Sequence, residues 1–206
     1  MKDKELTKQR IIDAVGEIFK TEGQNGLNIA RIAKKAGVDR NLIYRYFGKD
    51  VSRLIEAYII QKDYWMKFAE NIKTETGKSD HETSKDLLID ILQKQWQYFS
   101  ADMEMQQLIL WELSGKSELM KSIHNTREIM GQPILEIADV HFKDSSVKLR
   151  PILVLLLGGL YYANLHAMYN GNFISGLDVK SEQGQADILK SIQQILDWTY
   201  EHAEMK

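Results

Sequence analysis

The 206-residue chain contains no cysteine and only two prolines. Without cysteine it can form no disulfide, and zinc or iron–sulfur sites built on thiolates are excluded. The first ten residues, MKDKELTKQR, lack the apolar core of a secretory signal peptide. We therefore expect a protein of a reducing compartment, the cytoplasm.

Long apolar runs are also lacking. The longest, residues 152–163, is shorter than the roughly 20 residues that cross a bilayer, and the charged residues Lys148 and Arg150 precede it. This length predicts a buried helix and no membrane partner.

Signatures of catalysis and of metal binding are missing as well. The five histidines are scattered without HExxH or another zinc spacing, and they are His81, His124, His141, His166 and His202. Asp139 and His141 stand two residues apart, which points them to different faces of a helix. Walker-type loops, GxGxxG and GxSxG do not occur in the sequence. The sequence therefore predicts neither an enzyme nor a bound metal or cofactor.

The chain does have apolar residues at spacings of three and four, with no alternating run long enough for a convincing strand. This periodicity predicts an all-α protein. The charge is unevenly distributed, since residues 1–53 contain 12 Lys or Arg against 7 Asp or Glu. That segment carries a net charge of +5 and the remainder −7, within a total of −2. A basic N-terminal module suggests a polyanionic partner.

Capping and breaking residues divide the periodic sequence into helices. The expected N-caps are Thr7, Asn28, Asp39 and Asp50, and the expected breakers are Gly23, Gly37 and Gly48. The predicted helices cover residues 7–22, 29–36, 40–47, 51–72, 82–100, 103–113, 118–142, 147–169 and 185–203. Gly131 and Pro133 are expected to interrupt one of them.

Two short helices joined by a glycine turn, after a packing helix, are the ingredients of a helix-turn-helix, whose second helix enters the major groove of DNA. Apolar residues suited to its compact core are Ile18, Phe19, Ile32, Ala33, Val38 and Ile43. The second helix also carries side chains that cannot all be core, namely Arg40, Asn41, Leu42, Tyr44 and Arg45. Arginine and asparagine fit the edges of guanine and adenine, respectively. Residues 28–47 are therefore a candidate DNA reader, the alternative being a three-helix corner whose basic residues are only solvated.

The stretches IIDAVGEIF (residues 11–19) and NIARIAKKAGVDRNLIYRYF (residues 28–47) resemble the N-terminal signature of the tetracycline-repressor (TetR) family. The resemblance implies a three-helix DNA-binding domain over residues 1–49 and a helical effector-binding and dimerisation domain over residues 50–206. It implies phosphate contacts by Asn28, Tyr44, Tyr46 and Lys49, and places Arg40, Asn41, Leu42 and Arg45 at the bases or the adjoining backbone. The implied partners are double-stranded operator DNA, a small-molecule effector and a second copy of the chain.

The chain departs from the family pattern at a few positions. Asn41 and Leu42 are bulkier than the small residues usual there, and Leu42 could meet a thymine methyl group. Lys49 follows Phe47 by two positions, whereas the family usually has a lysine three positions on. The differences at Asn41 and Leu42 affect which operator sequence is recognised, and the shift of Lys49 affects how the next helix begins.

The segment from Pro151 to Tyr169 is too apolar for a surface helix, and its Gly158-Gly159 pair allows another backbone to approach closely. The last helix offers a matching stripe of Ile188, Ile192, Ile195 and Thr199, with Trp198 beside it. Together with their symmetry mates, these two helices would form a four-helix dimer interface. The alternative is a helix buried within one monomer.

The middle of the chain has more aromatic residues than a minimal core needs, with Gln95, Asn164 and His166 as polar groups among them. This composition is typical of a pocket for a hydrophobic or amphipathic effector. The candidate pocket residues are Trp65, Phe68, Trp96, Phe99, Trp111, Tyr161 and His166. The sequence thus predicts a ligand-responsive transcriptional repressor. The alternative is a helical ligand-binding or scaffold protein with a vestigial helix-turn-helix, which would not bind DNA.

Overall fold

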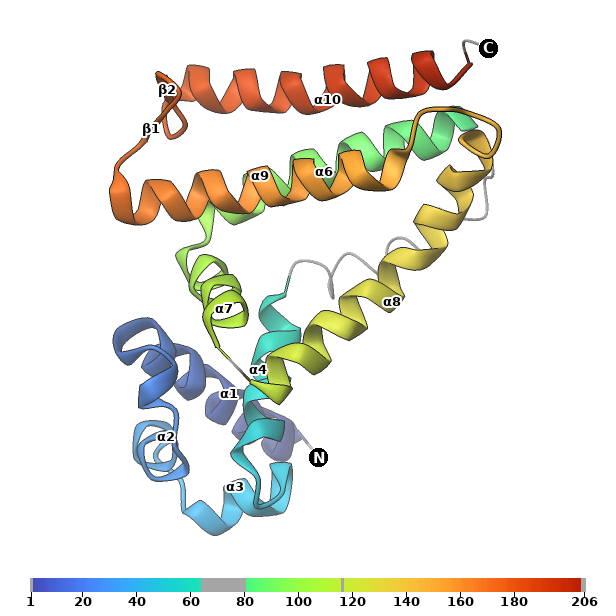
Figure 1. Cartoon of the computed structure of the whole chain (residues 1–206). Coiled ribbons are helices and arrows are strands. Elements are labelled where there is room, and N and C mark those ends of the chain that lie inside the picture. The colour runs from blue at the N-terminus through green and yellow to red at the C-terminus, as the bar shows by residue number, and fades with distance from the viewer. Residues whose placement is uncertain (1, 64–80, 116, 205–206) are drawn as a thin grey trace. The chain divides into compact units, whose positions relative to one another are not determined.

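A computed structural model describes residues 2–63, 81–115 and 117–204 of the chain. These residues form helices joined by short loops, with one small hairpin (Figure 1), which confirms the all-α prediction. The chain divides into two compact units: Met1–Lys67 with Gln107–Thr126, and Phe68–Gln106 with Arg127–Lys206. The boundary predicted between residues 49 and 50 separates a DNA-binding domain from an effector-binding domain by function. It stays a prediction.

The first unit contains four helices and a short 3₁₀ turn from the N-terminal part of the chain. They are α1 (Lys2–Glu22), the turn η1 (Gln24–Gly26), α2 (Ile29–Ala36), α3 (Arg40–Phe47) and α4 (Val51–Lys62). Helix α1 packs on both α2 and α4, and α3 packs on α2 and α4. The side chains that fill the space between them are fully buried, and they include Ile11, Val15, Phe19, Ile32, Ile43 and Leu54.

An aromatic cluster closes this core. The Phe19 ring lies 6.1 Å from the Tyr58 ring of α4 and 6.0 Å from the Trp111 ring. Trp111 comes from α7 (Met103–Ser114), whose residues from Gln107 onward belong to this unit. Phe19 therefore holds three helices of the unit together.

Helix α1 begins earlier than the sequence predicted, at Lys2 instead of Thr7. The Thr7 hydroxyl donates to the Asp3 carbonyl oxygen at 2.7 Å, so Thr7 lies inside the helix and is not its N-cap. Asp3 and Glu5 in the first turn favour this earlier start, because carboxylates stabilise the positive end of the helix dipole.

Helix α4 begins as predicted, because the Asp50 side chain accepts from the Ser52 backbone N–H at 2.9 Å. That hydrogen bond lowers the pKa of the Asp50 carboxyl below its ordinary value. The helix ends at Lys62, where Asp63 has extended backbone angles. The predicted continuation, with Trp65, Phe68 and Ile72, lies outside the described residues.

The second unit is built around α6 (His81–Ala101), which packs against both α9 (Leu149–Asn170) and α10 (Glu182–Glu204). The predicted apolar stripe of α6 is confirmed, since its members are all buried, namely Leu88, Ile91, Leu92, Trp96 and Phe99. Between α9 and α10, β1 (Phe173–Ile174) and β2 (Leu177–Asp178) form an antiparallel hairpin. Its turn uses positive φ angles at Ser175 (52°) and Gly176 (80°), which suit a two-residue hairpin loop.

Helix α8 (Glu118–His141) is continuous, so the predicted interruption at Gly131 and Pro133 is wrong. Proline removes one helical hydrogen bond, but Pro133 is exposed and its ring faces no crowded core. Ile134 and Ala138 on the following turns are buried, so the part of the helix after the proline is held by packing.

Helix α9 is only partly buried within one chain, contrary to the alternative of a helix buried within one monomer. Leu160 and Asn164 are buried, whereas Val154 and Leu155 are 70% and 75% exposed. By length and composition α9 could also cross a membrane, but a single such helix is a weak indication. The helix therefore presents an apolar face along Val154 and Leu155 that none of the described residues covers.

Candidate nucleic-acid interface

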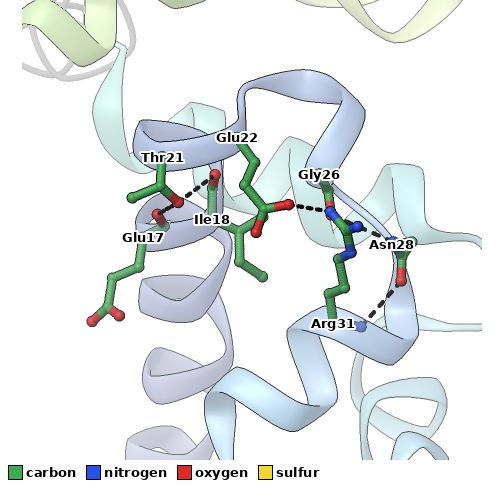
Figure 2. Close-up of polar contacts among 7 residues, drawn as sticks. All are labelled: Glu17, Ile18, Thr21, Glu22, Gly26, Asn28 and Arg31. Carbon is green, nitrogen blue, oxygen red and sulfur yellow. Dashed lines mark hydrogen bonds and ion pairs between the residues drawn. The ribbon is translucent and has the colours of Figure 1, made fainter.

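The turn before α2 packs tightly against α1 (Figure 2). Gly23 has a positive φ of 64°, which ends α1 and starts the turn η1. A Cβ atom on Gly26 would lie 2.6 Å from Glu22 Cβ and 2.9 Å from Ile18 Cγ2. Only glycine lets the chain pass this close to α1, so this position sets where α2 begins.

Asn28 caps α2 as the sequence predicted. Its side-chain oxygen accepts from the Arg31 backbone N–H at 3.0 Å, and its Nδ2 lies 3.5 Å from the Gly26 carbonyl oxygen (Figure 2). The cap satisfies one of the N–H groups that a helix leaves without an intrahelical partner.

Two ion pairs join α2 to α1. The Arg31 guanidinium pairs with the Glu22 carboxylate (Figure 2), and Lys35 Nζ lies 2.7 Å from Glu17 Oε2. Each pair is about half exposed, so each stabilises the packing by no more than about 1 kcal/mol. They balance two positive charges of α2 within the unit.

The turn between α2 and α3 also matches the prediction. Gly37 is left-handed (φ 63°), and its N–H donates to the carbonyl oxygens of Ala33 and Lys34. The Asp39 side chain then accepts from the Asn41 backbone N–H at 2.7 Å, which caps α3. Glycine and aspartate thus set the angle at which α3 leaves α2.

Helix α3 has a buried side and an exposed side. Ile43 is fully buried and anchors it, whereas Arg40, Asn41 and Arg45 are exposed. Leu42, Tyr44 and Tyr46 are half-buried, and Lys49 is exposed just beyond the helix. Packing therefore partly covers the Leu42, Tyr44 and Tyr46 side chains, while Lys49 is open to solvent.

The positive charges of α3 differ from those of α2. Within the described part of the chain, Arg40, Arg45 and Lys49 enter no ion pair. Arginine side chains without an acidic partner, on the exposed side of a short and well-capped helix, are available for a phosphate or for a base edge.

Sequence reasoning missed one neighbour of this surface. The Lys4 ammonium lies 5.8 Å from the centre of the Tyr46 ring, a cation–π distance. Lys4 precedes the predicted start of the first helix, and no role was predicted for it from the sequence. The longer α1 brings it beside α3.

The candidate pocket residues are found in several places. Trp65 and Phe68 lie outside the described residues. In the second unit, the rings of Phe99 and Tyr161 lie edge to face, 4.9 Å apart. His166 is half-buried, and its ring lies 5.6 Å from that of Tyr162.

Two other candidates have different neighbours. The Trp96 indole N–H donates to Gln185 Oε1 at 2.6 Å, so this side chain faces α10. Trp111 belongs to the first unit, where it contacts Phe19. Among the residues that the structure describes, no three His, Cys, Asp or Glu side chains lie together as a metal site would need.

Replacing Gly26 with alanine is expected to lower the free energy of unfolding of the first unit by about 1–3 kcal/mol, because the new methyl group overlaps Glu22 and Ile18. Urea denaturation followed by circular dichroism measures the change. Gly131→Ala is the matched control, since no atom of the described residues lies within 4 Å of a Cβ there. It should be neutral or stabilise α8 by up to about 1 kcal/mol. Equal effects of the two substitutions would contradict the packing described for Gly26.

Comparison with known proteins places the N-terminal helices in a described family. The model of "Bacterial regulatory proteins, tetR family" matches residues 11–49, which run from the core residues of α1 to Lys49. This confirms the resemblance read from the sequence. A search of curated proteins finds no match.

Solved structures share the fold over nearly the whole chain. FadR from Bacillus subtilis in complex with stearoyl-CoA has 20% identity and a TM-score of 0.65, covering 91% of this chain and 96% of that one. The fatty acid degradation regulator FadR from Bacillus halodurans has 19% identity and a TM-score of 0.60, covering 92% and 94%. NalD from Pseudomonas aeruginosa, the secondary repressor of the MexAB-OprM multidrug efflux pump, has 17% identity and a TM-score of 0.59, covering 96% of each chain. At these identities the likeness shows the fold.

Proposed function

Because this chain belongs to the tetR family of bacterial regulatory proteins, we propose that it is a ligand-responsive transcriptional repressor in the cytoplasm. It binds double-stranded operator DNA as a homodimer and leaves it when a small hydrophobic or amphipathic effector binds. The observation that carries the proposal is the exposed side of α3, where Arg40, Asn41 and Arg45 project from a helix anchored by Ile43. The family is not one of enzymes, so we propose no catalytic activity.

In this proposal the residues of the reader divide by role. Asn28, Tyr44, Tyr46 and Lys49 contact phosphates and set the position of α3 in the major groove. Arg40, Asn41, Leu42 and Arg45 contact bases or the adjoining backbone. Half-burial of the two tyrosine rings supports the first role, because a ring held by packing places its hydroxyl with little loss of entropy.

The apolar face of α9 supports a homodimer. Val154, Leu155 and Tyr162 are exposed, as is Trp198 on α10. No described residue lies within 4 Å of a Cβ built on Gly158 or Gly159, so packing within the described part of the chain does not require glycine at either position. A second copy that packs closely along α9 explains both features. Two copies could then present their α3 helices about 34–36 Å apart, which is one turn of DNA.

Effector control follows from linkage between two sites of one dimer. Helix α4 begins directly after the reader and packs on α1 and α3. We propose that effector binding shifts α4, changes the separation of the two α3 helices and lowers operator affinity. The fold shared with FadR, a regulator seen with stearoyl-CoA, is compatible with an amphipathic effector.

Fluorescence anisotropy with labelled DNA from upstream of the chain's own gene tests the reader. Tyr44→Ala should weaken binding to all sequences together, because a phosphate contact carries no sequence information. Arg40→Ala should cost about 1–3 kcal/mol on the preferred site and relax the preference at one base pair. Lys143→Ala, an exposed lysine outside the reader, is the control and should bind as the wild type does.

The same titration separates the two readings of the helix-turn-helix. Specific binding that weakens as salt rises supports the repressor. If purified wild-type protein shows no specific, salt-dependent binding, the helix-turn-helix is vestigial and the proposal is wrong.

A further inference from the structure

Polar side chains gather where α6 packs on α9, within the second unit. Gln95 and Asn164 are both fully buried, and Gln95 Nε2 donates to the Tyr161 hydroxyl at 3.1 Å. The Lys180 ammonium donates to Asn164 Oδ1 at 3.1 Å and to the Ser100 carbonyl oxygen at 3.2 Å. We call these residues the α6–α9 polar cluster: Gln95, Ser100, Tyr161, Asn164 and Lys180. Sequence reasoning missed Lys180, because its burial depends on residues up to 80 positions away.

Hydrogen bonding within the polar cluster is incomplete. Gln95 Oε1 and Ser100 Oγ are buried and have no hydrogen-bond partner among the described residues. Exchanging the oxygen and nitrogen of the Gln95 amide would still leave one end of it without a partner. Because an unsatisfied buried polar group costs about 1–3 kcal/mol, a bound molecule that completed these hydrogen bonds would be stabilised.

The positive charge of Lys180 has only neutral partners within the described part of the chain. Asp178 and Glu182 each stand two positions from Lys180, and neither forms an ion pair with its ammonium among the described residues. The Asp178 carboxylate instead accepts from the Lys180 backbone N–H at 3.0 Å. Burial accordingly lowers the pKa of Lys180 below its ordinary value. A half-buried cation with neutral neighbours favours an anion beside it.

The surroundings of the polar cluster limit the kind of anion. The Phe99 ring packs edge-on against Tyr161, and Leu160 is buried on the same helix. One ammonium balances one carboxylate, whereas a phosphate dianion would bring a second negative charge that the described residues do not neutralise. An apolar molecule with a single carboxylate therefore matches both the charge and the apolar neighbours.

We propose that the α6–α9 polar cluster binds the carboxylate of an otherwise apolar effector. Lys180 pairs with the carboxylate, and the Ser100 hydroxyl donates to it. The Gln95 amide turns its Nε2 toward the same group while its Oε1 accepts from the Tyr161 hydroxyl. The inference rests on the proposed function, because it assigns the chemical class of that regulator's effector.

Isothermal titration calorimetry with full-length protein tests the assignment. The probes are octanoate, dodecanoate and hexadecanoate, below their micelle concentrations, and their methyl esters serve as neutral controls of the same length. The wild type should bind at least one carboxylate at least about ten-fold more tightly than its ester, as expected for a charged hydrogen bond. Lys180→Met should remove this preference, and Lys180→Arg should keep most of it. Lys190→Met, an exposed lysine of α10, should bind as the wild type does.

The comparison of acid with ester distinguishes ligand binding from a structural role. If Lys180 only connects Asn164 to the end of α6, replacing it should weaken the binding of the carboxylate and of its methyl ester equally, or lower the helical content seen by circular dichroism. Either result, or a wild type that binds none of the carboxylates, would overturn the inference. Operator binding without any probe is measured in parallel. If the protein binds the operator but none of the carboxylates, only the effector assignment is wrong. If it does not bind the operator, the proposed function itself is wrong.

Discussion

Phe19→Ala is expected to lower the free energy of unfolding by about 3–5 kcal/mol, the usual cost of removing a buried phenylalanine side chain. Phe19 is 2% exposed, and its ring lies about 6 Å from those of Tyr58 and Trp111. Three helices of the first unit would lose their common contact. Urea denaturation at one fixed protein concentration measures the change, since the stability of a dimer depends on concentration.

Leu6→Ala is the matched control for this substitution. Leu6 lies on the same helix but is 63% exposed, so its removal should change stability by no more than about 0.5 kcal/mol. Phe19→Ala should also weaken operator binding, because α2 and α3 rest on the core that Phe19 fills. If the two variants unfold at the same urea concentration, Phe19 does not hold the first unit together.

Leu155→Lys is expected to convert the proposed dimer into a monomer. Leu155 is 75% exposed in one chain, so the substitution leaves the monomer fold intact. In a dimer it would place two unpaired ammonium groups in an apolar contact. The free energy of burying these charges is far larger than the free energy gained from the apolar contact. Light scattering should give half the wild-type mass, with unchanged helical content by circular dichroism.

Operator binding should fall with the dimer. A monomer has only one α3 helix, so it loses the affinity gained when two linked helices bind the same operator. The expected loss in affinity is roughly 10²–10⁴-fold. Ile129→Lys is the control, because Ile129 is also a large exposed apolar residue but lies on α8. It should stay dimeric and bind DNA normally. A Leu155→Lys variant that remains dimeric would refute the assignment of α9 to the interface.

The helix-turn-helix could be predicted almost residue by residue because its determinants are local. Asn28, Gly37 and Asp39 act on backbone groups within three or four positions of themselves, so their identities alone predict the ends of α2 and α3. The core position of Ile43 follows from helical periodicity in the same way. Because the same local residues make up the family's N-terminal signature, the resemblance to the family could also be seen in the sequence.

The predictions were wrong where a rule based on one residue was outweighed by other interactions, either tertiary packing or neighbouring residues in the sequence. Glycine and proline predicted a break in α8, but the helix is continuous, and Ile134 and Ala138 just after the proline are buried. Threonine predicted a cap for α1, but the carboxylates upstream moved the start to Lys2. Both outcomes depend on the sum of several weak effects, and composition alone does not rank them.

By itself the sequence determined the all-α class, the reader's caps and glycine turns, and the residues that α3 presents to solvent, because each depends on neighbours along the chain. Only the tertiary structure decided which face of α9 stays exposed, that Trp96 faces α10 while Phe99 faces Tyr161, and that Lys180 reaches Ser100 and Asn164. Those facts depend on which distant helices pack together. Burial, and the charge environment that burial creates, are properties of that packing.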